Sequence, residues 1–342
     1  MRRTSLHHVP SFCRHNRLIQ NCPICAREQD LELRPVVSPA GQSPRTSSHS
    51  PIRPPRRPGT QGGSRTAGRR SGPGVKVRHL ARGADDGYRS ELAPGLRSSE
   101  DAVRLAEEVA FAAARLDQLA IEPPGLYAEV ADPAGETEER TWLAFLIALL
   151  GPTEDDDPFA AIALARTTWA SGQPPSLEAA QAGPRGAYEP ATAARTVAGY
   201  RTWAARSGSQ EAAFNGEPSW SPERRFARVF ERLALPGFAR GARFELLSTL
   251  GRTGVYEVRA GALALGGSDD VTVAAKRLLG IGDPMLLERR AANLAEACGV
   301  EMEALDLGFY NWERGVRARV GMKAGLEPDP VVRVAVEDAL GL

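Results

Sequence analysis

The sequence predicts an all-α fold for most of the chain. Beyond about residue 96, apolar residues recur at spacings of three and four, several such segments follow a Ser or Asp cap, and strand-like alternation is scarce. The best candidate for a strand runs from Val255 to Leu265. We therefore predict a helical domain over 96–342, preceded by a Cys/His segment at 1–30 and a disordered linker at 31–95.

The predicted helices follow one another closely. The first begins after a Ser99 cap, since acidic residues occupy its first turn and apolar residues repeat through SSEDAVRLAEEVAFAAARLDQL. Another begins at Ser221, because Pro222 stands at its first turn. The Gly- and Pro-rich segment 171–190 divides the helices into two lobes. The helices predicted after the first cover 138–150, 158–170, 190–206, 221–234, 240–249, 270–279, 284–298 and 330–340.

Charge is distributed unevenly along the 342 residues. Through Ala84 there are sixteen Lys and Arg but three Asp and Glu, so this arm carries +13; because the whole chain carries +1, the remainder carries −12. A basic arm indicates an anionic partner, and its Arg-Pro and Arg-Gly content suits loose contacts with nucleic acid. A solvated linker without a partner is the alternative.

Composition excludes several classes of site and location. All five histidines lie in the arm, so the helical domain alone cannot build a Ser-His-Asp triad or a histidine-ligated metal site. The longest apolar run, Trp142 to Leu150, is shorter than the roughly 20 residues that span a bilayer. The first residues lack the apolar stretch of a signal peptide, and the few cysteines indicate a reducing compartment. We expect a cytoplasmic protein without a membrane partner.

A cysteine cluster near the start predicts a structural zinc ion. Cys13, His15, Cys22 and Cys25 form the pattern C-x-H-x6-C-x2-C, whose Cys-Pro-Ile-Cys half can present two thiolates to one tetrahedral ion. Four protein ligands would close the site, so it would stabilise the segment and would not catalyse a reaction. His7 or His8 could replace His15. A redox pair and incidental thiols are the alternatives.

The helical domain contains one informative stretch, Phe244 to Asp283. A Gly-rich turn, Leu250-Gly251-Arg252-Thr253-Gly254, precedes Asp269 and Asp270, which open a helix. Glycines let backbone amides approach a phosphate, and a helix N-terminus favours an anion. The turn is a phosphate cradle or a tight connection. The two acids are catalytic groups or helix caps.

This stretch resembles the helix-hairpin-helix DNA glycosylase superfamily, whose hairpin has the form L-P-G-x-G and whose later aspartate opens a helix of the form D-T-H-V-x-R-V-x-x-R-L-G. Here Leu250 to Gly254 would be the hairpin and 269–280 the aspartate helix. The hairpin departs from the form, having G-x-x-G, and lies sixteen positions before Asp270. Within the superfamily the stretch most resembles the third clade of alpha-glutamyl/putrescinyl thymine pyrophosphorylases, which are associated with hypermodified thymine in DNA.

The resemblance implies an enzyme that acts on a modified or damaged base in DNA. Asp270, or Asp269, would stabilise positive charge on the sugar as the base is released or modified. Bifunctional members have a lysine where this chain would have Tyr256, so a Schiff-base step is not expected. The residues expected to contact DNA are Gly251, Arg252, Thr253, Gly254, Tyr256, Lys276 and Arg277. The alternative is a non-enzymatic DNA-binding or scaffold protein that uses the zinc segment and the arm.

Two further patterns have alternative readings. Phe309, Tyr310 and Trp312 have helical spacing, which is typical of a core but would also allow stacking on an extruded base. Leu278-Leu279-Gly280-Ile281-Gly282 is a helix C-cap followed by Pro284, or a second phosphate-binding hairpin.

Overall fold

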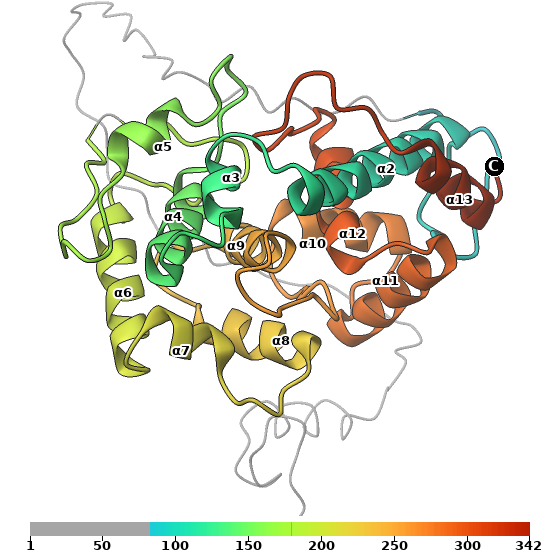
Figure 1. The fold of residues 1–342 in the computed structure, drawn as a ribbon. Helices are drawn as coiled ribbons and strands as arrows, with labels where there is room; N and C mark the ends of the chain where they lie inside the picture. The colour runs from blue at the N-terminus through green and yellow to red at the C-terminus, as the bar shows by residue number, and fades with distance from the viewer. Residues whose placement is uncertain (1–82, 179) are drawn as a thin grey trace, which may run out of the picture. The chain divides into compact units, whose positions relative to one another are not determined.

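The structure, a computed structural model, describes residues 83–178 and 180–342. These residues form helices joined by turns and irregular segments, and they contain no strand (Figure 1). The candidate strand at 255–265 consists of bends and irregular backbone, with a φ of 55° at Ala264. The predicted zinc ligands Cys13, His15, Cys22 and Cys25, and most of the linker 31–95, lie outside the described residues.

The helices alternate between long packing elements and short connecting ones. In chain order they are α2 (Ser99–Ile121), α3 (Leu126–Ala131), α4 (Thr137–Leu150), α5 (Ala160–Ala165), α6 (Ala193–Arg206), α7 (Gln210–Asn215), α8 (Pro222–Arg232), α9 (Arg240–Arg252), α10 (Asp270–Leu279), α11 (Pro284–Cys298), α12 (Met302–Arg314) and α13 (Pro330–Leu340).

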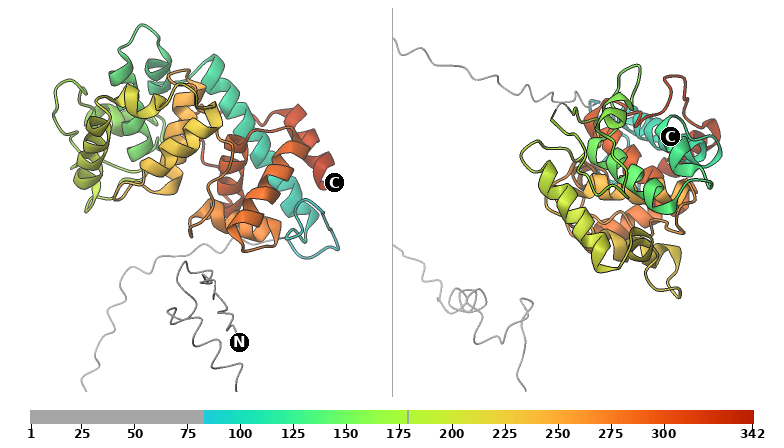
Figure 2. Two further views of the ribbon diagram at one scale, coloured as in Figure 1. Left: turned by 90° about the horizontal axis from the view of Figure 1, so that it is seen from below. Right: turned by 60° about the vertical axis from the view of Figure 1, so that its left-hand side comes forward.

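One group of helices forms around α2. This long helix packs against α12 and α13, and α10 packs on α12 (Figures 1 and 2). Gly308 allows α12 to approach α2 closely, because a Cβ atom there would lie 2.7 Å from Cγ2 of Val109. The indole of Trp312 donates a 3.0 Å hydrogen bond to the carbonyl oxygen of Asp101. These contacts hold α12 in place, and α12 in turn supports α10, the helix that begins at Asp269 and Asp270.

A second group forms around α4, whose residues from Thr141 to Leu150 are all buried. Helix α9 packs against α4, α2 and α8, so it joins the two groups. Its buried residues run from Phe244 to Leu250 on nearly every side. Because α9 is enclosed in this way, both of its ends have fixed surroundings, and the candidate functional residues lie at these ends.

Most predicted helices are confirmed, with two corrections of their bounds. The cap of α2 is Ser98, whose hydroxyl accepts the N–H of Asp101, whereas Ser99 donates to the Asp86 carboxylate. The helix predicted over 158–170 ends at Ala165. Beyond it, the indole of Trp142 donates a 2.8 Å hydrogen bond to the carbonyl oxygen of Thr167. This tertiary contact outweighs the local helical preference of the segment.

Three helices are absent from the sequence prediction. Helices α3 and α7 have six residues each, too few for a helical period to be recognised. Helix α12 is buried from Met302 to Trp312, including its polar residues Glu303, Asp306 and Asn311, so its polar positions do not mark an exposed face. Phe309, Tyr310 and Trp312 belong to the hydrophobic core, as the core reading predicts.

Two other expectations can be compared with the described residues. Gly280 has φ of 64° and ends α10, which agrees with the C-cap reading of 278–282. Within 83–178 and 180–342, no helix combines the length and the apolar composition that crossing a bilayer requires.

Candidate active site

A short connection between α8 and α9 lies at the N-terminal end of α9. It contains the sequence Leu235-Pro236-Gly237-Phe238-Ala239 and links these two helices. Gly237 has φ of +78°, and a Cβ atom there would lie 2.6 Å from Oγ1 of Thr196, so a larger residue is excluded. The Thr196 hydroxyl also donates a 2.7 Å hydrogen bond to the carbonyl oxygen of Pro236. The connection is thereby held against α6.

The turn predicted at Leu250-Gly251-Arg252-Thr253-Gly254 is not a hairpin between two helices. Leu250, Gly251 and Arg252 belong to α9, and the chain turns only at Thr253 and Gly254. The N–H of Val255 returns to the carbonyl oxygen of Leu250, and Gly254 has φ of +70°. This is a helix C-terminus closed by glycine, which accounts for the Gly-rich sequence without a ligand.

Asp269 lies at the N-cap of α10. Its carboxylate accepts the Thr272 hydroxyl at 2.8 Å and the Thr272 N–H at 3.3 Å. On its other side, Oδ1 lies 3.6 Å from Nη1 of Arg240, the first residue of α9. The side chain is 27% exposed, so solvent or a ligand can reach it. The structure therefore brings Asp269 to the N-terminal end of α9, beside the Leu-Pro-Gly connection.

Asp270 points elsewhere. Its Oδ2 atom lies 3.6 Å from Nη1 of Arg314 at the end of α12, and the side chain is 41% exposed. No described residue other than Arg314 forms an ion pair with it. Of the two acids proposed from the sequence, only Asp269 is both capping α10 and paired with α9.

The guanidinium of Arg240 is anchored in the protein interior. Its Nη2 atom donates to Oδ1 of Asp306 at 2.6 Å, and Nε donates to the carbonyl oxygen of Leu263 at 3.1 Å. Its Nη1 atom is buried and forms no hydrogen bond within the described residues, although it faces Asp269. One donor of a rigidly held cation is therefore left at the carboxylate.

A series of buried charges continues inward from Asp306. This carboxylate also accepts Arg185, whose Nε atom lies 3.6 Å from Oε2 of Glu245, and Glu245 in turn accepts Arg115. Cation and anion alternate throughout, from Asp269 near the surface to Arg115 in the core. Removing one member leaves a neighbour charged and desolvated, which is costly.

The two arginines determine the ionisation of Asp306. Burial alone raises the pKa of this carboxyl, but Arg240 and Arg185 outweigh burial and hold the pKa below its ordinary value. Burial lowers the pKa of the nearby Arg243, and the charge of Arg240 lowers it further, while Asp269 opposes both effects. Positive charge is thus concentrated at the first turn of α9.

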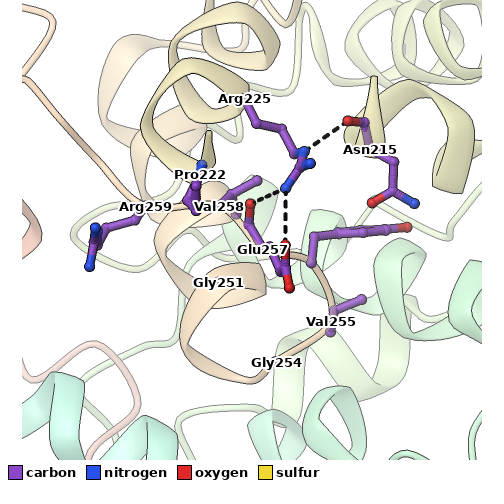
Figure 3. A pocket seen from close by; sticks show the side chains of 10 residues that line it. Asn215, Pro222, Arg225, Gly251, Gly254, Val255, Glu257, Val258 and Arg259 are labelled. Carbon is purple, nitrogen blue, oxygen red and sulfur yellow. Dashed lines mark hydrogen bonds and ion pairs between the residues drawn. The ribbon is translucent and has the colours of Figure 1, made fainter. Parts of the chain in front are cut away.

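The C-terminal end of α9 borders a cavity of about 630 Å³ (Figure 3). Arg225 reaches across it from α8 and donates to the carbonyl oxygens of Asn215 at 2.8 Å and Glu257 at 2.6 Å. Gly251 and Gly254 line the same cavity, but Asp269 and Asp270 do not. At a rise of 1.5 Å per residue, α9 separates this cavity from Asp269 by roughly 18 Å. The turn and the acids therefore do not face one another.

The other residues expected to contact DNA at this end are engaged within the protein. Tyr256 is 6% exposed; its ring stacks on Phe214, and its hydroxyl lies 2.7 Å from that of Thr141. The Thr253 hydroxyl donates to the Thr249 carbonyl oxygen at 2.8 Å. Arg252 forms an ion pair with Glu301 at the start of α12.

Lys276 and Arg277 lie on exposed positions of α10. Lys276 Nζ approaches the carbonyl oxygen of Gly267 at 3.5 Å, and Arg277 pairs with Glu313. Both are one or more turns from Asp269, as their spacing in the sequence predicts.

The sequence also contains a hairpin-like motif at the α8–α9 connection, although the hairpin was predicted at 250–254. The hairpin form L-P-G-x-G is matched in its first three residues by Leu235-Pro236-Gly237, but Ala239 stands in place of the second glycine. The turn at 250–254 has two glycines, at 251 and 254, and therefore matched the form in glycine content. Asp306 and Arg185 had no such signal, because a buried ion pair between distant segments leaves no periodic pattern. Among the described residues, no group of three or more His, Cys, Asp and Glu side chains is arranged to hold a metal ion.

Comparisons with known proteins agree with the resemblance. No curated protein and no solved structure matches the chain. A family model described as alpha-glutamyl/putrescinyl thymine pyrophosphorylase clade 3 matches residues 185–319. This range begins at Arg185 and includes the α8–α9 connection, Asp269 and Asp306. Over these residues the chain is similar to the alpha-glutamyl/putrescinyl thymine pyrophosphorylase family, clade 3, the group that its sequence resembles.

Proposed function

We propose that the protein is a DNA base-modifying enzyme related to helix-hairpin-helix glycosylases and that Asp269 is its charge-stabilising carboxylate. One observation carries the proposal: Asp269, at the N-cap of α10, is paired with the first residue after a Leu-Pro-Gly connection between two helices. The superfamily places its hairpin and its aspartate in the same order. The match to a thymine pyrophosphorylase family supports a thymine-derived base as the substrate.

The chemistry requires a carboxylate that is accessible and fixed in orientation. Cleavage or substitution at a base or its sugar develops positive charge, which a preorganised anion stabilises. Thr272 orients Asp269 by bonding both of its oxygens, and the side chain is 27% exposed. The reacting nucleotide would leave the duplex stack to reach it.

The α8–α9 connection would hold the DNA backbone. Ala239 provides no side-chain cap for α9, so the N–H groups of its first turn remain available to an anion. Arg240 and Arg243 add positive charge at the same turn. A phosphate group would therefore be favoured here, at the opposite end of α9 from the turn first expected to bind it.

The residues also disfavour a covalent lysine step. With the hairpin at 235–239, Gly241 occupies the position two residues past the last hairpin residue, where bifunctional members have lysine. Glycine offers no nucleophile, so Schiff-base formation has no group to begin from.

Two isosteric variants test the assignment. The full chain, Asp269→Asn and Asp270→Asn would be incubated with a duplex carrying a modified thymine and with an unmodified duplex, and loss or change of the base would be measured. Asn is as good an N-cap as Asp, so Asp269→Asn keeps α10 folded. We expect Asp269→Asn to lower the rate by about 10²-fold and Asp270→Asn to remain within a few-fold of the wild type.

Other results would overturn the assignment. Unchanged activity in Asp269→Asn, or a larger loss in Asp270→Asn, would contradict the role of Asp269. Wild-type protein that binds both duplexes but alters neither base would favour the alternative of a non-enzymatic DNA-binding or scaffold protein.

A further inference from the structure

A second cavity lies along α6, apart from the candidate active site. It has a volume of about 500 Å³, within the range of small-molecule sites. Ala193, Val197 and Ala198 of α6 form one side of it, while Thr196, on another face of the helix, bonds to the α8–α9 connection. The cavity thus faces a different direction from the connection.

The opposite wall of this cavity is apolar and tied in place. It consists of Pro174, Pro175, Leu177 and Tyr188. The Tyr188 hydroxyl donates a 2.5 Å hydrogen bond to the carbonyl oxygen of Leu177, and Ser176 N–H donates to Ala165 at 3.2 Å. These bonds join the wall to itself and to the end of α5 (Ala160–Ala165).

One cation lines the cavity. The Arg201 guanidinium lies against two neighbouring indoles, 4.7 Å from the ring centroid of Trp142 and 4.6 Å from that of Trp169. Its Nε atom is buried and has no hydrogen-bond partner in the described part of the chain. Its other nitrogens make long bonds, 3.4 Å and 3.2 Å, to the carbonyl oxygens of Trp169 and Gln173.

No carboxylate among the described residues forms an ion pair with Arg201. The charge of Glu139 acts on it, but the Glu139 oxygens accept the N–H groups of Trp169 and Ala170. Burial therefore lowers the pKa of Arg201 below its ordinary value. A partly desolvated cation with apolar neighbours is stabilised when an anion joins it.

We propose that this cavity binds an amphipathic organic anion, with its flat apolar body between α6 and the proline-rich wall and its anionic head at Arg201. Glu178 also lines the cavity and is exposed. Its negative charge disfavours a second anionic group at the other end of the ligand, so a monoanion charged at one end fits best. Contact of the guanidinium with two indoles keeps the cation oriented at the cavity.

A pair of matched dyes tests the proposal on the full-length chain. Anilinonaphthalenesulfonate has the proposed form, and phenylnaphthylamine has the same body without the charge. We expect one equivalent of the sulfonate to bind, with fluorescence enhancement and a calorimetric signal, and the neutral dye to bind about tenfold more weakly. Arg201→Met, which keeps an unbranched side chain beside the indoles, should reduce sulfonate binding to the level of the neutral dye.

A cavity-filling variant gives an independent measurement. Ala198→Phe places a ring on an exposed, lining position of α6 and should abolish binding of both dyes. Ala205→Phe makes the same change at an exposed position of α6 outside the lining and should leave binding unaltered. Equal affinity for the two dyes, or binding that survives Ala198→Phe, would overturn the proposal. The outcome is independent of DNA and of Asp269.

Discussion

The two ends of α9 are held in different ways. At the N-terminal end, Arg240 joins Asp306 in the interior to Asp269 near the surface, and positive charge lies beside uncapped amides. At the C-terminal end, glycines close the helix, and Arg225 donates its hydrogen bonds to backbone carbonyl oxygens. Glycine therefore marks where the chain turns. A candidate reactive site is marked instead by charged side chains whose hydrogen bonds and ion pairs are only partly formed within the fold.

The largest expected effect is a loss of stability when the buried charges at the N-terminal end of α9 are disrupted. Asp306→Ala leaves Arg185 and Arg240 buried without their shared carboxylate, so we expect the free energy of unfolding to fall by about 3–5 kcal/mol. Urea denaturation monitored by circular dichroism would measure it. Asp270→Ala, at an exposed pair, is the control and should cost less than about 1 kcal/mol. Similar losses in both variants would contradict the distinction between the buried charges at Asp306 and an exposed ion pair.

A matched pair of glycine substitutions compares the ends directly. In Gly251→Ala the new Cβ atom would lie 2.2 Å from the Val258 carbonyl oxygen, so we expect a loss of about 1–3 kcal/mol in the free energy of unfolding. In Gly241→Ala it would meet nothing within 4 Å, and the better helix former should add up to about 1 kcal/mol. Thermal and urea denaturation would show opposite signs; equal signs would contradict the geometry.

A milder change asks whether the C-terminal end contacts DNA. Tyr256→Phe removes the hydroxyl that lies 2.7 Å from Thr141 and should lower the free energy of unfolding by about 0.5–1.5 kcal/mol. Because the ring is buried, fluorescence anisotropy should show unchanged affinity for duplex DNA. A clear loss of DNA affinity in a variant that remains folded would indicate that DNA binds at the turn after α9.

The smallest expected effect is a pH dependence from two carboxyls on α12. Burial raises the pKa of Glu303 above 4.5, since only one oxygen is bonded, to the N–H of Ala260 at 2.7 Å. Its contribution to stability is complete below pH 4.5 and is lost as the pH rises through the raised native pKa. Asp306 has the opposite sign: its lowered native pKa means that stability is lost as the pH falls through it.

Glu303→Gln isolates the first of these contributions. Unfolding free energies would be measured at a series of pH values on either side of 4.5. The variant should lose the decline that the wild type shows above that value and keep the acid-side decline due to Asp306. An unaltered slope above it would show that Glu303 is not the group responsible.

Much of the fold follows from local sequence. Ser221, Asp269, Asp283 and Asp329 accept N–H groups at the starts of their helices, and glycines at 280, 299 and 315 end three helices, so bounds at these places are readable from residue type. Local rules fail where a distant residue intervenes. The indole of Trp142 bonds Thr167, within the segment 158–170 that is predicted to be helical, and α12 buries its polar residues along with its apolar ones.

The candidate site was half predictable for the same reason. Asp269 was identified because a cap and a catalytic acid have one sequence signature. The hairpin was assigned to the more glycine-rich turn at 250–254, although Leu235-Pro236-Gly237 was present. Arg240 and Asp306 are 66 positions apart, and only the folded structure shows that their side chains meet.

The alternating series of charges from Arg115 to Asp269 also constrains how the protein can change during evolution. A single substitution at any internal member leaves a neighbour charged in a dry environment, so intermediates on a mutational path are poorly folded. Compensated double replacements, such as an apolar pair at Arg240 and Asp306, avoid that penalty. Lineages should therefore retain these residues together or exchange them together, so that the series is inherited as one unit.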